Sequence, residues 1–159
     1  MMKRTKAYTM TLLLTLLSTG LLCAQTVTKQ GVVYTFVGDH YEATAFDAAS
    51  AEAEQWNGSI IIADAINDIP VTVVAPSAFD GTLYPLCANS AKTIVVGANV
   101  KTIGDFAFYL CRYVEDLTLG AEIQTIGAKA FYGCNALGDV VFGAALATIG
   151  NAAFLNCTG

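Results

Sequence analysis

The feature that most constrains this chain is a ten-residue phrase that returns at a fixed interval. TIGDFAFYLC at positions 102–111 is followed 23 residues later by TIGAKAFYGC, and 23 residues after that by TIGNAAFLNC. A fixed period in the twenties indicates supersecondary units stacked along one axis. An earlier, irregular copy aligns Val74, Phe79, Cys87 and Ile94 with the same pattern and carries about six extra residues around DGTLYP.

The segments between the phrases predict one short strand in each unit. Apolar residues follow an L-x-x-L-x-L spacing, at Val114, Leu117 and Leu119 in one unit and at 137, 140 and 142 in the next. Alternation along a strand turns Leu117 and Leu119 inward and leaves Asp116 and Thr118 outward. TIG is a second short extended piece, and a glycine after each strand lets the chain turn.

One such unit cannot fold alone. About six inward apolar side chains contribute on the order of 10 kcal/mol when they are buried, whereas ordering about 23 backbones costs roughly 1–2 kcal/mol each. Neighbouring units must therefore cover each other, which predicts a mainly β solenoid of 23-residue units with short turns and helical pieces. Residues 74–159 would hold three units and an incomplete fourth.

The stretch 25–73 has a different pattern. GVVYTFVGDHYEATAF alternates around a Gly-Asp pair, which predicts a β-hairpin. DAASAEAEQWNGS is polar and rich in alanine, so we expect a loop or one short helix, and SIIIAD is a further strand. We interpret residues 25–73 as an N-terminal β cap that shields the first unit.

The repeat, T-I-G-x-x-A-F-x-x-C-x-x-L-x-x-V-x-F-G, resembles the BspA-like branch of leucine-rich repeats. The resemblance covers roughly residues 74–159, and WNGSIIIADAINDIPVTVVAPSAF is similar to the lead-in of such arrays, which extends it to about 31–73. The chain departs from the usual pattern by Gly-Ala where Pro-Ser often follows the strand, by the insertion in its first unit, and by the lack of a terminal cap. The resemblance implies an exported bacterial protein of the Bacteroidetes type that attaches to host matrix proteins or to other microbes.

Residues 1–24 have the pattern of a signal peptide: basic residues, an apolar run and a small residue, Ala24, before the expected cut. A retained membrane anchor and a lipoprotein with Cys23 as the lipidated residue are the alternatives. Five basic and all thirteen acidic residues follow position 24, which gives a net charge of −8 there. This charge disfavours nucleic acid and anionic membranes as partners. We expect the cell surface, the outer membrane or secretion, with the periplasm as a further possibility, and no membrane span after cleavage.

Motifs that carry chemistry are few. The single histidine, His40, lies in a predicted turn, and the serines stand in no nucleophile motif. Asp116 and Asp139 occupy equivalent outward positions and suit a shared Ca²⁺ or, equally, separate surface charges. We expect no cofactor, no metal and no enzymatic activity.

Four cysteines hold one position of the repeat: Cys87, Cys111, Cys134 and Cys157. Exported cysteines usually pair as disulfides. Side chains stacked one unit apart are parallel, however, with Cβ atoms about 5 Å apart, whereas a disulfide needs about 3.8 Å and converging bonds. We therefore expect buried thiols acting as small apolar fillers. Bridges such as Cys111–Cys134 remain the alternative, and zinc is disfavoured by the linear arrangement.

The predicted function is non-catalytic binding of a protein or glycan through the outward side of the strands. A solenoid offers there a broad, regular surface. The alternatives are a spacer or stalk within a longer surface protein and, with the least support, a polysaccharide hydrolase. The open end of the last unit predicts self-association. The residues predicted to form the binding face are Thr93, Val95, Asp116, Thr118, Asp139 and Val141.

Overall fold

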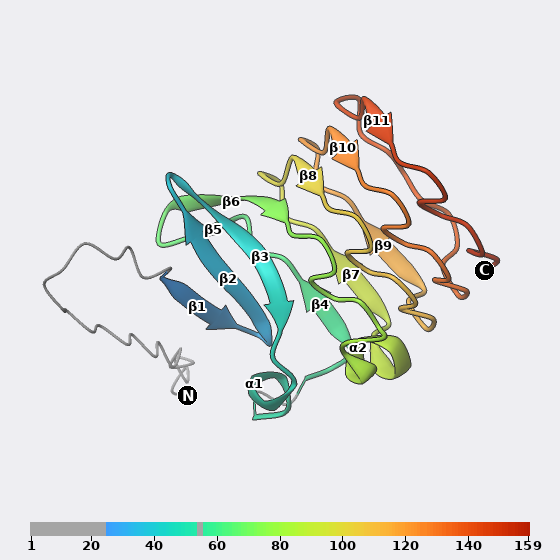
Figure 1. Cartoon of the computed structure of the whole chain (residues 1–159), viewed down its shortest axis with the longest axis horizontal. Coiled ribbons are helices and arrows are strands. Elements are labelled where there is room, and N and C mark those ends of the chain that lie inside the picture. The colour runs from blue at the N-terminus through green and yellow to red at the C-terminus, as the bar shows by residue number, and fades with distance from the viewer. Residues whose placement is uncertain (1–24, 54–55) are drawn as a thin grey trace, which may run out of the picture.

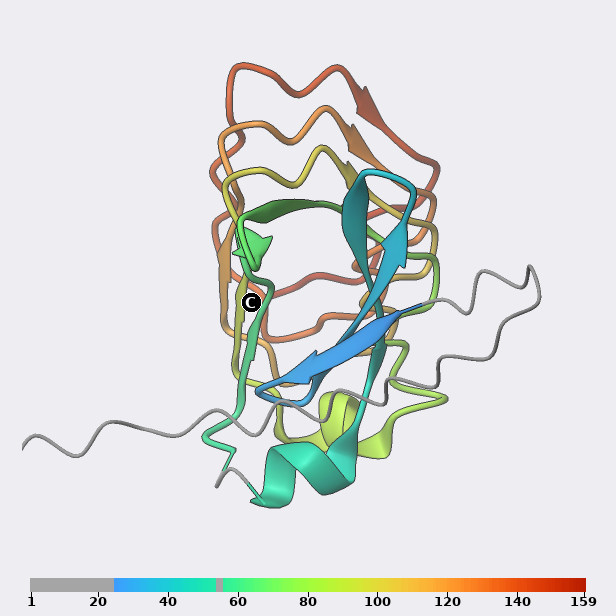
Figure 2. The same ribbon diagram turned by 90° about the vertical axis from the view of Figure 1, so that its left-hand side faces the viewer.

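The computed structural model describes residues 25–53 and 56–159, so the predicted signal peptide lies outside the described residues. The chain winds into coils that follow one another from a β cap at one end to residue 159 at the other (Figure 1). Viewed along the stack, the coils nest as successive loops (Figure 2). The predicted β solenoid with an N-terminal β cap is confirmed.

The cap is a meander of three antiparallel strands: β1 (Thr26–Lys29), β2 (Val32–Val37) and β3 (His40–Phe46). Its turns are two residues long. Gln30 and Gly31 both have positive φ (52° and 77°), while Gly38 (φ 72°) is the first residue of the other turn. Such turns match the twist of adjacent strands. The predicted hairpin is therefore present, and β1 extends it.

The cap continues into the solenoid through one long sheet. The strands that follow β3 are parallel to it and lie in the order β6 (Ile69–Val74), β8 (Thr102–Ile103), β10 (Thr125–Ile126) and β11 (Thr148–Ile149). The last three are the TIG segments, and equivalent residues of the repeat are partners in the register. A short strand, β5 (Ala65–Ile66), pairs antiparallel with β6.

A second sheet forms the other wall of the solenoid. It contains the three parallel strands β4 (Ser59–Ile61), β7 (Thr93–Val95) and β9 (Asp116–Thr118). Tyr34 joins it to the cap, because the hydroxyl of Tyr34 donates to the carbonyl of Ile61 (3.3 Å) and accepts from the N–H of Ala63 (3.0 Å).

The third side of each coil consists of turns that are hydrogen-bonded from coil to coil. The N–H groups of Ser77, Phe79 and Gly81 donate to the carbonyls of residues 105, 107 and 109 at 2.9, 2.8 and 2.7 Å, and later coils repeat the pattern. Every fourth residue there has positive φ, as at Phe106 and Leu110 (both 57°) and at Ala152 (55°) and Asn156 (65°). The backbone polar groups of this side are thus satisfied without a regular strand.

The interior is a column of phenylalanines beside a row of thiols. Phe79, Phe108, Phe131 and Phe154 stack with centroids 5.0–5.1 Å apart and ring planes within 10°. Parallel strands lie about 4.7–4.9 Å apart, so each coil places its ring directly on the one before. The period of the sequence therefore sets the packing of the core.

Two short helices depart from the regular coil. The first, α1 (Ala48–Ala53), follows the cap, and Asp47 Oδ1 accepts hydrogen bonds from the N–H groups of Ala49 (3.1 Å) and Ser50 (3.3 Å). The second, α2 (Pro85–Ser90), ends the insertion of the first unit and begins with proline. None of the helices in the described part is long and apolar enough to cross a membrane.

Candidate interaction face

The outward side of β4, β7 and β9 brings surface residues from three coils into register. We call this surface the outward face. Because the strands are parallel and in phase, their outward residues form rows across the coils. One row is polar and one is more apolar; they are Ser59–Thr93–Asp116 and Ile61–Val95–Thr118.

Four of the six residues predicted for the binding face lie together on these rows. Thr93 is the register partner of Asp116, and Val95 is the partner of Thr118. Asp116 and Thr118 are exposed, whereas Thr93 and Val95 are half-buried. A regular, shallow surface is therefore present, and its role in binding stays a prediction.

The expected strand at 139–141 is absent, so Asp139 and Val141 do not extend the sheet. Residues 139–141 form no strand, and Val141 is 83% exposed. A Cβ built on Gly143 would lie 3.2 Å from the carbonyl oxygen of Ala121. At the equivalent Gly97 a Cβ would lie 2.6 Å from the carbonyl oxygen of Ala63, so the last coil lies further from the coil before it. Gly138 occupies the position of Glu115, directly before the strand, and glycine there favours extended backbone less than other residues do.

Ser59 and Ile61 are face residues that the sequence analysis missed. The strand SII was predicted, but it was assigned to the cap because the insertion in the first unit hides its alignment with TIV at 93–95. The structure pairs the two strands residue for residue. Ile61 is 38% exposed and adds an aliphatic side chain to the more apolar row.

The charges along the edge of the outward face largely cancel. Lys92 Nζ lies 2.8 Å from Glu115 Oε1, just before β7 and β9. The hydrogen bond and the charge of Glu115 raise the pKa of Lys92. On the rows of the sheet, Asp116 is the one charged residue. The face thus offers short aliphatic and hydroxyl side chains with little net charge.

Aromatic rings also gather on the turn side of the coils. Tyr109 stacks on Tyr132 at 5.1 Å with ring planes 20° apart, and Phe106 packs against Tyr109 at 5.5 Å. Lys129 Nζ lies 5.5 Å from the Phe106 centroid. Since the tyrosine ring faces cover each other, this row is chiefly packing between coils.

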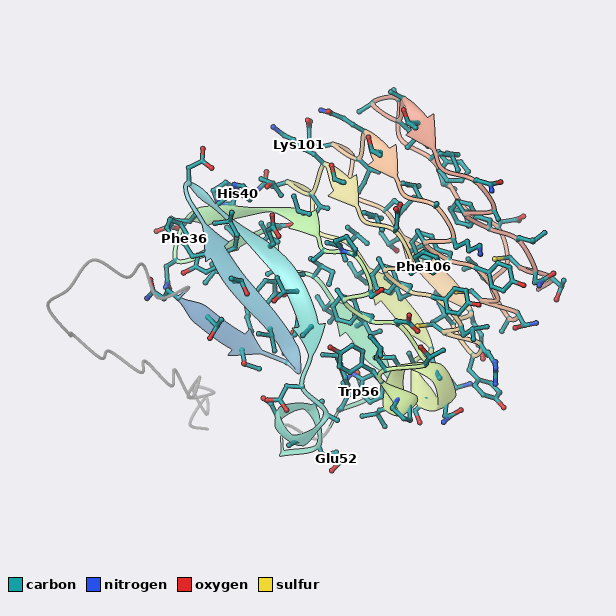
Figure 3. The ribbon with its side chains drawn as sticks, viewed as in Figure 1. Phe36, His40, Glu52, Trp56, Lys101 and Phe106 are labelled. Atoms are coloured by element: carbon teal, nitrogen blue, oxygen red, sulfur yellow. The ribbon has the colours of Figure 1, made fainter. Side chains whose placement is uncertain are left out.

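Among the residues that the structure describes, the single histidine contacts two neighbouring carboxylates and no nucleophile. Within the described part of the chain, the ring of His40 contacts the carboxylates of Asp39 (2.8 Å) and Glu42 (3.6 Å). This contact lowers the pKa of Asp39. His40 lies at the far end of the cap from Trp56 (Figure 3). No group of three or more His, Cys, Asp or Glu side chains suited to a metal occurs among residues 25–53 and 56–159.

The four cysteines of the described part are free thiols, as the stacking argument predicted. Those that follow the regular phrase donate to the carbonyl of the phenylalanine one coil earlier, for example Cys111 Sγ to Phe79 O at 3.3 Å and Cys134 Sγ to Phe108 O at 3.4 Å. Burial raises the pKa of the Cys87 thiol to about 12 and moves those of Cys111 and Cys134 upward as well. The thiols are therefore neutral and poor nucleophiles.

Comparison of the sequence with protein-family models decides the family. The model for the BspA type leucine rich repeat region matches residues 71–159 with six copies. The chain belongs to the BspA-type leucine-rich repeat family. A search of curated protein sequences gives no match.

Solved structures share the fold of this BspA-type repeat protein. A leucine-rich repeat protein from Bacteroides capillosus has a TM-score of 0.67 at 22% identity, over 80% of this chain and 93% of that one. The leucine rich repeat protein of T. pallidum has a TM-score of 0.62 at 20% identity, over 82% of this chain and 66% of that one.

A leucine rich cell surface protein from Faecalibacterium prausnitzii has a TM-score of 0.66 at 19% identity. The match covers 85% of this chain but 35% of that protein. At these identities the likeness concerns the fold. The same fold thus occurs in a solved chain of similar length and as part of a much longer one.

Proposed function

We propose that this BspA-type repeat protein is a non-catalytic, exported binding protein that attaches to a partner protein or glycan through its outward face. The observation that carries the proposal is the alignment of Ile61, Val95 and Thr118 across three coils. Flat sheet surfaces of solenoids bind partners over wide areas, with small contributions from many contacts. The sequence of residues 1–24 and the description of the F. prausnitzii relative as a cell surface protein support a place at the surface or outside the cell.

The test is binding of the purified protein to immobilised fibronectin, to fibrinogen and to bacterial cells. Val95→Arg and Thr118→Arg put long cations into the middle of the more apolar row. We expect each to weaken binding at least about tenfold, because a desolvated charge without a partner opposes contact. Gln124→Arg is the matched control, since residue 124 is exposed and lies directly before β10, in the other sheet from the outward face.

The outcome that contradicts the proposal is binding that all three variants retain equally, or no binding to any of the probes. A second candidate, a spacer within a longer surface protein, is favoured by the F. prausnitzii relative, of which the match covers about a third. A spacer would bind none of the probes, while a longer natural chain that contains it would bind them.

A further inference from the structure

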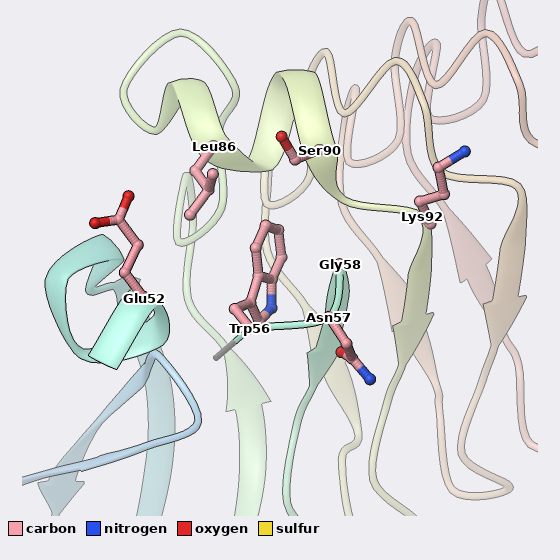
Figure 4. A pocket seen from close by; sticks show the side chains of 7 residues that line it. All are labelled: Glu52, Trp56, Asn57, Gly58, Leu86, Ser90 and Lys92. Carbon is pink, nitrogen blue, oxygen red and sulfur yellow. The ribbon is translucent and has the colours of Figure 1, made fainter. Parts of the chain in front are cut away.

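A pocket lies where the cap meets the first coil, outside the outward face. It has a volume of about 560 Å³ and is open to solvent. It is lined by α1, by the loop before β4 and by α2, and Figure 4 shows the indole of Trp56 in the middle of these residues. Its size is in the range of pockets that take small ligands, about 300–1,000 Å³.

The indole of Trp56 is held in place and supplies an apolar wall. Its Nε1 donates to the carbonyl of Ser59 at 2.8 Å, and its ring packs against Phe46 at 5.4 Å. Gly58 lets the loop pass close to α2, because it has φ 86° and a Cβ there would lie 2.9 Å from the carbonyl oxygen of Ser90. Since the N–H is already used, the ring offers the pocket carbon surface alone.

Residues with unused hydrogen-bonding capacity also line the pocket. Asn57 Oδ1 accepts from the N–H of Ser59, which leaves its NH₂ group as a donor. Among the described residues, the carboxylate of Glu52 and the hydroxyl of Ser90 have no hydrogen-bond partner, whereas the ammonium of Lys92 is held by Glu115. The pocket therefore presents an acceptor, a donor and a hydroxyl that can act as either.

We propose that this pocket binds a neutral pyranose unit of a glycan. A pyranose has one face of C–H groups that packs on an aromatic ring and a rim of hydroxyls that both donate and accept hydrogen bonds. An anionic ligand would meet the carboxylate of Glu52 and a strongly negative chain. A cationic ligand could pair with Glu52 and would leave the donor of Asn57 without an acceptor, so a cation is included among the tests below. A purely apolar ligand would leave the polar rim without partners.

The proposal does not rest on binding through the outward face. Its residues are outside the two rows, so each site can fail without the other. Trp56 is the one tryptophan of the chain, so its fluorescence reports this pocket alone. The probes are the methyl pyranosides of glucose, galactose, mannose and N-acetylglucosamine, titrated into the tens of millimolar, where weak binding of small polar ligands lies.

We expect at least one pyranoside to produce a saturable change in the emission of the whole protein. Ser90→Ala and Glu52→Ala, both at exposed positions, should each weaken pyranoside binding about fivefold, the loss expected for one hydrogen bond. Thr118→Arg on the outward face should leave it unchanged. Saturation-transfer NMR on the same samples detects a bound sugar even where the emission does not respond.

Three results would overturn the proposal. The first is no saturable signal by either method for any pyranoside. The second is a signal that Ser90→Ala and Glu52→Ala leave unaltered. The third is saturation by the methyl ester of Nα-acetyl-lysine in place of the sugars, which would make this a site for a cationic side chain.

Discussion

Successive coils approach each other closely at the repeated glycine of TIG, so any larger residue there should destabilise the fold. A Cβ built on Gly127 would lie 2.5 Å from the backbone nitrogen of Asp105 and 2.6 Å from the carbonyl carbon of Gly104, although ordinary contacts begin at 3.4 Å. Gly127 has no left-handed φ, so the effect of Gly127→Ala is steric. The obstacle is backbone, which cannot rotate away as a side chain would.

The structure allows the magnitude to be worked out. To accept the methyl group, the two coils must separate by about 1 Å. The hydrogen bonds from Gly127 N to Ile103 O (2.8 Å) and from Ala128 N to Asp105 Oδ1 (2.7 Å) would then be too long to persist. Their loss, at about 1 kcal/mol each, together with overpacking predicts a destabilisation of about 3 kcal/mol. The melting temperature should fall by about 10 °C.

Two other glycines provide matched controls. Gly138 has open space around its Cβ position and no left-handed φ, so Gly138→Ala should be neutral or stabilise the fold by up to about 1 kcal/mol. Gly38 also has open space but a φ of 72°, so Gly38→Ala should cost about 1 kcal/mol from backbone strain. The assay is urea unfolding followed by circular dichroism. If Gly127→Ala unfolds at the same urea concentration as Gly138→Ala, the coils are not in the close contact described above.

Three further outcomes are expected. Phe108→Ala removes a fully buried ring that stacks between Phe79 and Phe131, so urea unfolding should show a loss of about 3–5 kcal/mol, and a loss below about 1 kcal/mol would contradict the column. Ala152→Gly relieves a φ of 55° and should stabilise the fold by about 0.5–1 kcal/mol in the same assay, whereas a destabilising result would show that the residue is not strained. Burial raises the pKa of Cys87 from 9.0 to about 12 and that of Cys111 upward, so the unfolded chain loses these protons first. Stability should be complete below about pH 9 and decline above it, as urea midpoints from pH 8 to 10.5 would show; an equal decline in Cys111→Ala would remove that thiol from the cause.

The repeat period was enough to predict the core because one spacing determines many contacts. Once residues 23 apart are placed on neighbouring coils, Phe108 must meet Phe131, and the cysteines must be parallel and too poorly oriented for bridges. The same logic gave the outward positions of β7 and β9. These features depend on local pattern and on strand geometry alone.

The features that the sequence did not predict depend on contacts between particular coils. The insertion in the first unit ends in α2, for which Pro85 is the one local indication, and it obscured the membership of β4 in the second sheet. The missing strand at 139–141 results from weak contact between coils. The pocket at Trp56 combines a helix, a loop and a second helix from different parts of the chain, so no local sequence motif predicts it.

The row of neutral thiols has a consequence for how this protein would reach its native state after the proposed export. With Cys87, Cys111, Cys134 and Cys157 all free in the folded molecule, maturation calls for no oxidant, no isomerase and no correct choice among rival pairings. Folding of such a chain therefore does not depend on molecular oxygen. The thiols are open to oxidation only until the chain folds, because Cys87, Cys111 and Cys134 are buried in the native structure.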